Sequence, residues 1–193
     1  PQEVDSNNRL LVGAPRGNSS IGKLVVFDRN SDLNFTKSFE VTPPAEFQQI
    51  NMQFGASSTS LDDLLIVGAP NDDDFAGSVY LFQKELNGSY SFLEKVVDEN
   101  PQDGDLFGYK LKLSDSWLAT SSLQTTSGGT GKVSIFEIEP DNSISYHTEI
   151  FASDASTGDE FGFDLSMNEN WLVVGAPKSS SQENGEDSGA VYI

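Results

Sequence analysis

Carboxylates are the most numerous side chains in this sequence that could do chemistry. Paired carboxylates act as acid and base in glycoside hydrolysis, and grouped carboxylates ligate calcium. The acidic clusters lie at residues 71–74, 103–105, 159–160 and 183–187. None of the 30 acidic residues is singled out as a catalytic pair, although any two could converge in the fold. We interpret the clusters as solvated loops, and Asp72, Asp73 and Asp74 are the candidate ligands if a metal binds.

Residues 17–24 come close to the glycine-rich loop that binds nucleotide phosphates. Position 24 is Leu, where the motif needs Ser or Thr to hold magnesium. The segment also leads into an apolar run typical of a strand, whereas phosphate binding needs a helix N-terminus. The same Gly-Lys-apolar pattern recurs at residues 131–133, so we interpret it as part of a structural repeat and predict no nucleotide.

The sequence offers little for nucleophilic or multi-histidine metal chemistry. It contains one histidine, His147, no cysteine and no Gly-x-Ser-x-Gly segment. A catalytic triad or a histidine metal site would have to be built around His147 alone. We therefore predict no catalytic residue, no cofactor and a protein that is not an enzyme.

The charge of the chain excludes two classes of partner. Its 11 Lys and Arg against 30 Asp and Glu give a net charge of −19. Nucleic-acid binding and docking on anionic lipid both require clustered basic residues, so neither is predicted. The longest apolar runs, such as residues 64–67, are too short to insert into a bilayer.

Three short motifs recur along the chain with one period. Phe-Gly pairs stand at Phe54-Gly55, Phe107-Gly108 and Phe161-Gly162. Gly-Ala-Pro triplets end apolar runs at Gly13–Pro15, Gly68–Pro70 and Gly175–Pro177. A glycine that precedes a further apolar run follows at Gly22, Gly77, Gly131 and Gly189. A repeat of about 54 residues indicates that one supersecondary unit is stacked several times.

Each period predicts four short strands and no helix. The first strand begins at Phe-Gly, the second ends at Gly-Ala-Pro, the third follows the lone glycine, and a weaker fourth completes the unit. A β-sandwich has no reason to repeat the same anchors, whereas four-stranded units in series are typical of propeller blades. The predicted fold class is an all-β propeller of antiparallel four-stranded blades, here a partial ring of roughly 3.5 blades.

We expect residues 1–193 to form one partial propeller. Blade 1 covers about residues 1–50 and lacks most of its first strand, blade 2 covers about 51–104, blade 3 about 105–158, and blade 4 about 159–193 without its last strand. Because both ends fall inside a repeat, the sequence predicts a segment of a longer ring with open strand edges.

The succession Phe-Gly, Gly-Ala-Pro and Gly-x-Val-Tyr resembles the FG-GAP repeat of integrin α-subunit propellers. It is most similar to the variant found in microbial and protist surface proteins, and the best match runs from Asp154 to Ile193. The resemblance implies a complete ring of about seven blades and an extracellular or cell-surface location.

Repeats of the integrin type often carry a calcium loop with alternating Asp and Asn oxygens. The corresponding residues 56–63, 109–116 and 163–170 lack both the alternation and the glycine of that loop. Calcium needs six to eight oxygen ligands, so the metal residues of the family are not carried over.

Two further groups of residues carry expectations. Trp117 and Trp171, at equivalent repeat positions, are predicted to pack between blades, as are the phenylalanines of the Phe-Gly pairs. Glycosylation sequons begin at Asn18, Asn34 and Asn87. The last two fall in the same hairpin of successive blades, which suits glycan attachment if the protein is secreted by a eukaryote.

These observations predict a non-catalytic extracellular or cell-surface propeller for protein–protein adhesion or assembly of a surface structure. A protein partner, or a second copy, would bind through loops or open edges. Two alternatives stay open: the propeller segment of a secreted hydrolase, and a calcium-dependent ligand-binding module. Fold alone does not decide among them.

Overall fold

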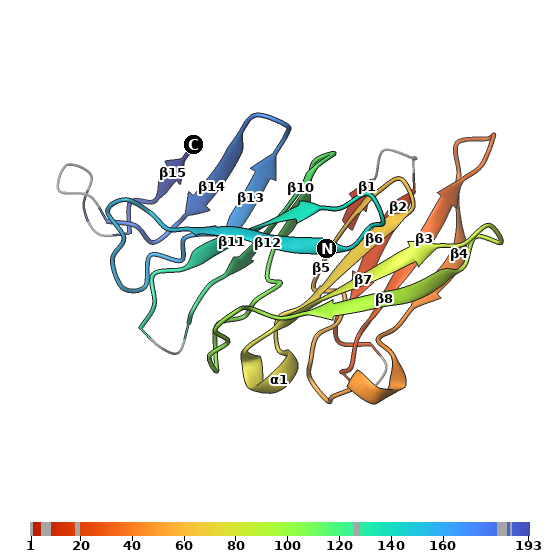
Figure 1. The fold of residues 1–193 in the computed structure, drawn as a ribbon, viewed down its shortest axis with the longest axis horizontal. Helices are drawn as coiled ribbons and strands as arrows, with labels where there is room; N and C mark the ends of the chain where they lie inside the picture. Colours follow the sequence, from red (N-terminus) through yellow and green to blue (C-terminus); the bar gives the residue numbers. More distant parts are fainter. Residues whose placement is uncertain (1, 5–8, 18–19, 126–127, 181–184, 186) are drawn as a thin grey trace.

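The chain is all-β, as the sequence predicts. The computed structural model describes residues 2–4, 9–17, 20–125, 128–180, 185 and 187–193. Among them the only helical turns are η1 (Ala45–Phe47) and α1 (Asp72–Phe75). The rest is antiparallel strand and connecting loop (Figure 1). No helix in this described part is long and apolar enough to span a membrane.

The strands form four sheets that follow one another along the chain. The first contains β1 (Gln2–Val4), β2 (Leu10–Ala14), β3 (Lys23–Arg29) and β4 (Phe35–Val41). The second contains β5 (Ser57–Leu61), β6 (Leu64–Ala69), β7 (Ser78–Lys84) and β8 (Tyr90–Val96). The third contains β9 (Leu111–Leu113), β10 (Trp117–Ser122), β11 (Lys132–Ile138) and β12 (Ile144–Ile150). The fourth contains β13 (Asp164–Met167), β14 (Leu172–Ala176) and β15 (Ala190–Tyr192).

Within each sheet the strands pair in sequence order, so every sheet is a simple meander. The third and fourth strands of the first three sheets share an irregularity in register, at Val26/Phe27, Leu81/Phe82 and Ile135/Phe136. A bulge bends a strand and increases its twist. The recurrence shows that the hairpin of the third and fourth strands is built alike in the first three sheets, while the blade boundaries drawn from the sequence stay a prediction.

The hydrophobic core lies between successive sheets rather than within one of them. One cluster joins Leu11 and Leu24 of the first sheet to Phe54 and Tyr80 of the second. Two further clusters repeat this arrangement between the second and third sheets and between the third and fourth. Each sheet therefore buries both faces only where it has a neighbour on each side, as propeller blades do.

Phe-Gly pairs hold the junctions between sheets. The rings of Phe54, Phe107 and Phe161 are all buried. Gly77 forms a parallel bridge with Phe107, and a Cβ on Gly77 would overlap the Phe107 carbonyl oxygen. The glycine before the third strand thus lets the next sheet approach at backbone distance.

Two local expectations need correction. Trp171 is 63% exposed, so it is not a core residue. Trp117 packs against His147 of β12, 4.9 Å between ring centroids, and the fourth sheet has no fourth strand among the described residues to cover Trp171 in the same way. The pair Asn87-Gly88 between two strands also predicts a type I′ turn, which needs a positive φ at both residues, but only Gly88 has one, 85°.

Candidate functional site

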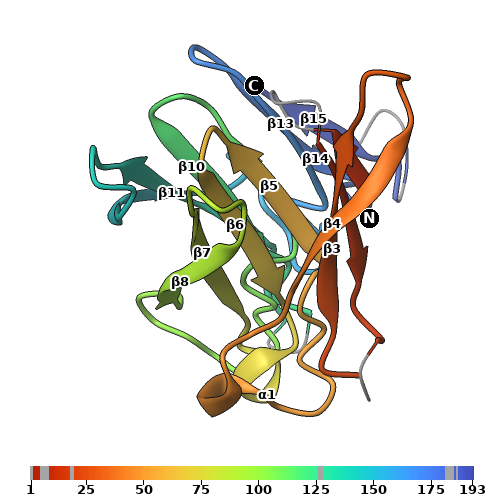
Figure 2. The ribbon, with the colours of Figure 1, turned by 90° about the vertical axis from the view of Figure 1, so that its right-hand side faces the viewer.

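The acidic residues 72–74 lie in α1, in the loop between β6 and β7 (Figure 2). Asp72 is buried; it accepts a 2.6 Å hydrogen bond from the Tyr80 hydroxyl and lies 2.9 Å from the Lys95 ammonium. Asp73 lies 2.7 Å from the same ammonium. The hydrogen bond from Lys95 lowers the pKa of Asp73, and burial followed by the bond to Asp72 raises the pKa of Tyr80.

Lys95 of β8 lies against this acidic loop and pairs with two of its carboxylates. Burial opposes its charge, but the hydrogen bonds to Asp73 and Asp72 outweigh burial and raise its pKa. Over the described ranges no three Asp, Glu or His side chains come together as a metal site. The carboxylates of Asp72 and Asp73 therefore tie the loop to β8 through Lys95.

Two other predicted acidic residues stabilise turns. Asp105 accepts a hydrogen bond from the backbone N–H of Gln102 at 3.0 Å, and Asp159 accepts one from Ser156 at 2.8 Å. Both precede a Phe-Gly pair by two residues and are buried. Burial also raises the pKa of Asp105. These carboxylates fix the loop that leads into the first strand of a sheet.

A different group of polar and aromatic residues gathers where the first strands of the third and fourth sheets begin. We call it the inner-strand cluster, and it contains Tyr109, Lys110, Glu160, Phe163 and Asp164. The Lys110 ammonium lies 3.4 Å from Asp164, and the rings of Tyr109 and Phe163 are 5.9 Å apart. Glu160 is paired with Lys178 at 2.6 Å. The cluster therefore spans two sheets and combines aromatic faces with both signs of charge.

The backbone turn at the Phe-Gly pair determines where this cluster lies. Residue Glu160, directly before Phe161, has a left-handed backbone with φ of 57°, and Gln53 and Leu106 have the same conformation at the equivalent positions. The N–H of Phe163 then donates to the carbonyl oxygens of Glu160 and Gly175. The turn thereby aims the side chains at the start of the first strand towards the neighbouring sheet.

The charges of two carboxylates affect the pKa of Tyr109. Its pKa is raised, first by burial and then by the negative charges of Glu160 and Asp164. A phenol held neutral in this way donates a hydrogen bond up to higher pH than an ordinary tyrosine. The cluster therefore presents a donor, two carboxylates and two aromatic rings to one region.

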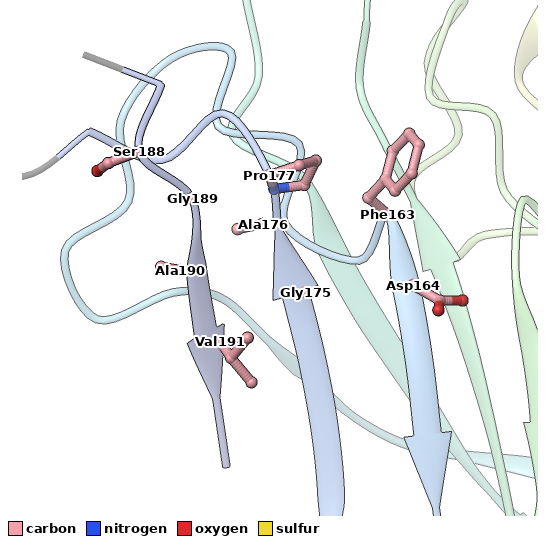
Figure 3. Close-up of a pocket in the computed structure, with 9 residues that line it drawn as sticks. All are labelled: Phe163, Asp164, Gly175, Ala176, Pro177, Ser188, Gly189, Ala190 and Val191. Atoms are coloured by element: carbon pink, nitrogen blue, oxygen red, sulfur yellow. The ribbon is translucent and has the colours of Figure 1, made fainter. Parts of the chain in front are cut away.

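Cavities adjoin the cluster on both sides. One of about 170 Å³ lies towards the second sheet, with Tyr109 and Lys110 in its wall. The other, of about 470 Å³, is lined by Phe163 and Asp164 and by the ends of β14 and β15 (Figure 3). A ligand bound along this row would contact the inner-strand cluster from either side.

Sequence reasoning recognised Glu160 as acidic but did not single out the other four members. The available signal was variation inside the repeat: Ala56-Ser57 in the second sheet becomes Tyr109-Lys110 in the third and Phe163-Asp164 in the fourth. Positions that vary among otherwise regular repeats carry local chemistry rather than the shared fold. Their convergence across two sheets required the three-dimensional structure.

The predicted glycosylation sites lie on the outer hairpins. Asn34 and Asn87 are exposed, in the β3–β4 and β7–β8 hairpins. Asn18, with Glu183 and Glu186 of the last acidic cluster, falls outside the described residues. Glycan attachment to these asparagines, like the extracellular location, stays a prediction.

Four meander sheets packed face to face in chain order define the chain as part of a β-propeller. Residues 145–193 match the family model described as FG-GAP repeat. The prediction of an FG-GAP β-propeller is thereby confirmed, while similarity to integrins in particular stays a resemblance of motifs.

Solved structures share the fold at low sequence identity. A protein from Lactobacillus plantarum matches with a TM-score of 0.54 at 14% identity, over 100% of this chain and 53% of its own. Sucrose-6-phosphate hydrolase from Lactobacillus gasseri matches with a TM-score of 0.57 at 12% identity, over 91% and 39%. Endo-arabinase from Bacteroides thetaiotaomicron matches with a TM-score of 0.50 at 10% identity, over 98% and 72%. The chain thus spans about half, or less, of the first two matched proteins.

These matches correct one sequence-based conclusion. The absence of a nucleophile motif and the single histidine predicted a protein that is not an enzyme, and this prediction is wrong, because two of the matched structures are hydrolases of sugar substrates by their names. The physical reason is that glycoside hydrolysis needs only two carboxylates brought together by the fold. No local sequence motif marks such a pair.

Proposed function

We propose that the chain is the propeller segment of a carbohydrate-acting hydrolase. The observation that carries the proposal is geometric: the Lys110–Asp164 ion pair and the ring contact between Tyr109 and Phe163 join the starts of two adjacent sheets, where Glu160 also lies. The hydrolases among the matched structures support the choice of substrate class. Two carboxylates flanking a glycosidic bond are the groups that hydrolysis requires.

Each member of the inner-strand cluster has a task in this proposal. Tyr109 and Phe163 offer apolar ring faces to the C–H face of a sugar, and the Tyr109 hydroxyl donates to a sugar oxygen. Glu160, held by Lys178, and Asp164, held by Lys110, supply the carboxylates on either side of the glycosidic bond. The two lysines hold these carboxylates in position through ion pairs.

Binding of short arabino-oligosaccharides and of sucrose to the full chain tests the proposal, with calorimetry as the readout. Release of reducing sugar then tests hydrolysis. Asp164→Asn and Glu160→Gln should each abolish sugar release, and Tyr109→Ala should weaken binding at least tenfold. Asp32→Asn is the matched control, because Asp32 is an exposed acid in a distant hairpin and its loss changes the net charge equally.

The outcomes separate the alternatives. Binding and hydrolysis that depend on the cluster support the proposal. Failure of every sugar to bind contradicts it and returns attention to the adhesion function predicted from the resemblance. Equal loss in the Asp32→Asn control would show that net charge, not the cluster, governs binding.

A further inference from the structure

The cavity between the second and third sheets has a wall that differs in charge from most of this protein. Its volume is about 170 Å³, and it adjoins the inner-strand cluster. The polar side chains in its described wall are Gln53, Asn71, Tyr109 and Lys110, and no carboxylate is among them. The chain has a net charge of −19, so a wall with one positive charge and no carboxylate is a local exception. Such a wall favours a ligand with a negatively charged group.

Two amide side chains of this wall have hydrogen-bonding groups that the described part of the protein does not use. Asn71 directly precedes α1 but makes no capping hydrogen bond through its side chain. Its backbone N–H donates to the Met52 carbonyl oxygen at 3.2 Å, which holds it beside the neighbouring residue Gln53. Gln53 likewise makes no side-chain hydrogen bond to a described residue. Both amides can therefore donate to the oxygen atoms of a ligand.

The positive charge of the wall distinguishes this junction from the equivalent positions in the neighbouring sheets. Lys110 is the third residue after the Phe of its Phe-Gly pair, and Ser57 and Asp164 have the same place in the second and fourth sheets. Ser57 is buried and donates to the Gly108 carbonyl oxygen at 2.6 Å, so it offers a ligand nothing. The chain thus presents an ammonium at one junction and a carboxylate at the equivalent position of the next.

The ion pair between Lys110 and Asp164 leaves the ammonium able to bind a second anion. The two groups are 3.4 Å apart, and their side chains are 40% and 73% exposed. An exposed ion pair contributes little to stability, and an ammonium has three N–H donors. Salt screens exposed charges beyond about 8 Å at physiological ionic strength, so the acidic residues elsewhere on the chain repel a ligand here only weakly.

The size of the cavity suits one substituent of a ligand rather than a whole ligand. Sites that enclose complete small molecules usually measure roughly 300–1,000 Å³. This cavity, of about 170 Å³, is smaller. Tyr109 and Lys110 belong both to its wall and to the inner-strand cluster, so the two are continuous. A ligand with one group in the cavity would therefore extend along Tyr109 towards Asp164.

We propose that this cavity binds the anionic group of an acidic sugar, which is either the carboxylate of a uronic acid or the phosphate of a sugar phosphate. Lys110 supplies the opposite charge, and the amides of Asn71 and Gln53 donate to the oxygens of the anion. The inference rests on the proposed function and deepens it, because it names the charged class of sugar that the inner-strand cluster would act on.

Calorimetry on the full chain with two pairs of probes tests this inference. Digalacturonic acid is compared with its neutral dimethyl ester, and glucose 6-phosphate is compared with glucose. In at least one pair the acidic probe should bind at least tenfold more tightly than the neutral one, and that pair identifies the anion as carboxylate or phosphate. Equal affinities within both pairs would overturn the inference and leave the proposed function standing. Failure of all four probes to bind would contradict both.

Two variants of the cavity wall locate the binding. Asn71→Asp puts a carboxylate into the wall at almost unchanged size, so the preference for the acidic probe should fall at least tenfold. Gln53→Glu makes the same change on the other amide and replaces the first variant if its melting temperature is lowered. The matched control, Asn87→Asp, adds an equal charge in the exposed β7–β8 hairpin and should keep the preference. An undiminished preference in both wall variants, or an equal loss in the control, would refute the site.

Discussion

The second and fourth sheets are built from the same repeat and meet different surroundings. In the second sheet every strand of the meander is present, and β6 is buried along its whole length between two neighbours. In the fourth sheet the equivalent strand, β14, is only partly buried, and Trp171, Val191 and Ile193 are exposed. The difference in burial arises from the neighbours, since the sequence anchors are the same.

The comparison teaches that stability in this protein resides at junctions between sheets. A sheet with a neighbour on each side contributes to two hydrophobic clusters, whereas the fourth sheet contributes to one. Repeat proteins in general gain stability from such nearest-neighbour interfaces. Substitutions at the interface between two packed sheets should therefore lower the free energy of unfolding far more than equivalent substitutions on the open side of the fourth sheet.

Truncation of a junction phenylalanine should have the largest effect. Phe107→Ala removes a fully buried ring between the second and third sheets and should lower the free energy of unfolding by about 4 kcal/mol. Phe163→Ala, where the ring is 40% exposed, should cost about 0.5 kcal/mol. Urea denaturation of both variants measures the difference. Similar costs would contradict the junction model.

Loss of a buried ion pair should have the second-largest effect on stability. Lys132 of β11 lies 2.9 Å from Asp98 and 2.7 Å from Glu149, with both Lys132 and Asp98 buried at the junction of the second and third sheets. Lys132→Met leaves the Asp98 charge unpaired and should cost about 3 kcal/mol. Lys110→Met breaks the exposed pair with Asp164 and should cost about 0.5 kcal/mol. Thermal unfolding of the two variants measures whether burial of an ion pair, rather than pairing alone, determines its contribution to the free energy of unfolding.

Replacing two equivalent glycines by alanine should give a smaller difference in stability. Gly68→Ala forces the second and third sheets apart and should cost about 2 kcal/mol, because the new Cβ would overlap Gly108. The Cβ of Gly175→Ala meets only ordinary contacts, the nearest with the Asp164 carbonyl oxygen at 3.7 Å, so this variant should change stability by about 0.5 kcal/mol or less. If chemical denaturation gives both variants the same midpoint, the fourth sheet is not open at this position.

Alkaline pH should produce the smallest change in stability, through the buried lysines Lys95 and Lys132. Burial opposes the charges of Lys95 and Lys132, but their hydrogen-bonded carboxylates outweigh it and raise both pKa values above the ordinary 10.5. A lysine whose folded-state pKa is raised stabilises the protein fully below its unfolded pKa, and this contribution is lost as pH rises through the folded-state value. The urea midpoint should therefore fall as the pH rises above 10.5, and less so in Lys132→Met. An unchanged midpoint would exclude a stabilising role for these lysines.

The period of the anchors was enough to predict the fold class. Phe-Gly, Gly-Ala-Pro and the lone glycine each report a close backbone approach or a strand end, and such requirements are readable from residue type alone. Strand order within each sheet followed, because short connections favour antiparallel neighbours. The buried places of Phe54, Phe107 and Phe161 follow from the same constraints.

Tertiary structure decided the rest. It turned Asp72 and Asp73 from candidate metal ligands into partners of Lys95, since only the packing of β8 against the loop brings that ammonium within 2.9 Å. It also brought Tyr109 and Asp164, from different repeats, into one cluster. Repeat periodicity fixes what each sheet has in common, whereas contacts between non-equivalent side chains of neighbouring sheets depend on distances that no local pattern encodes.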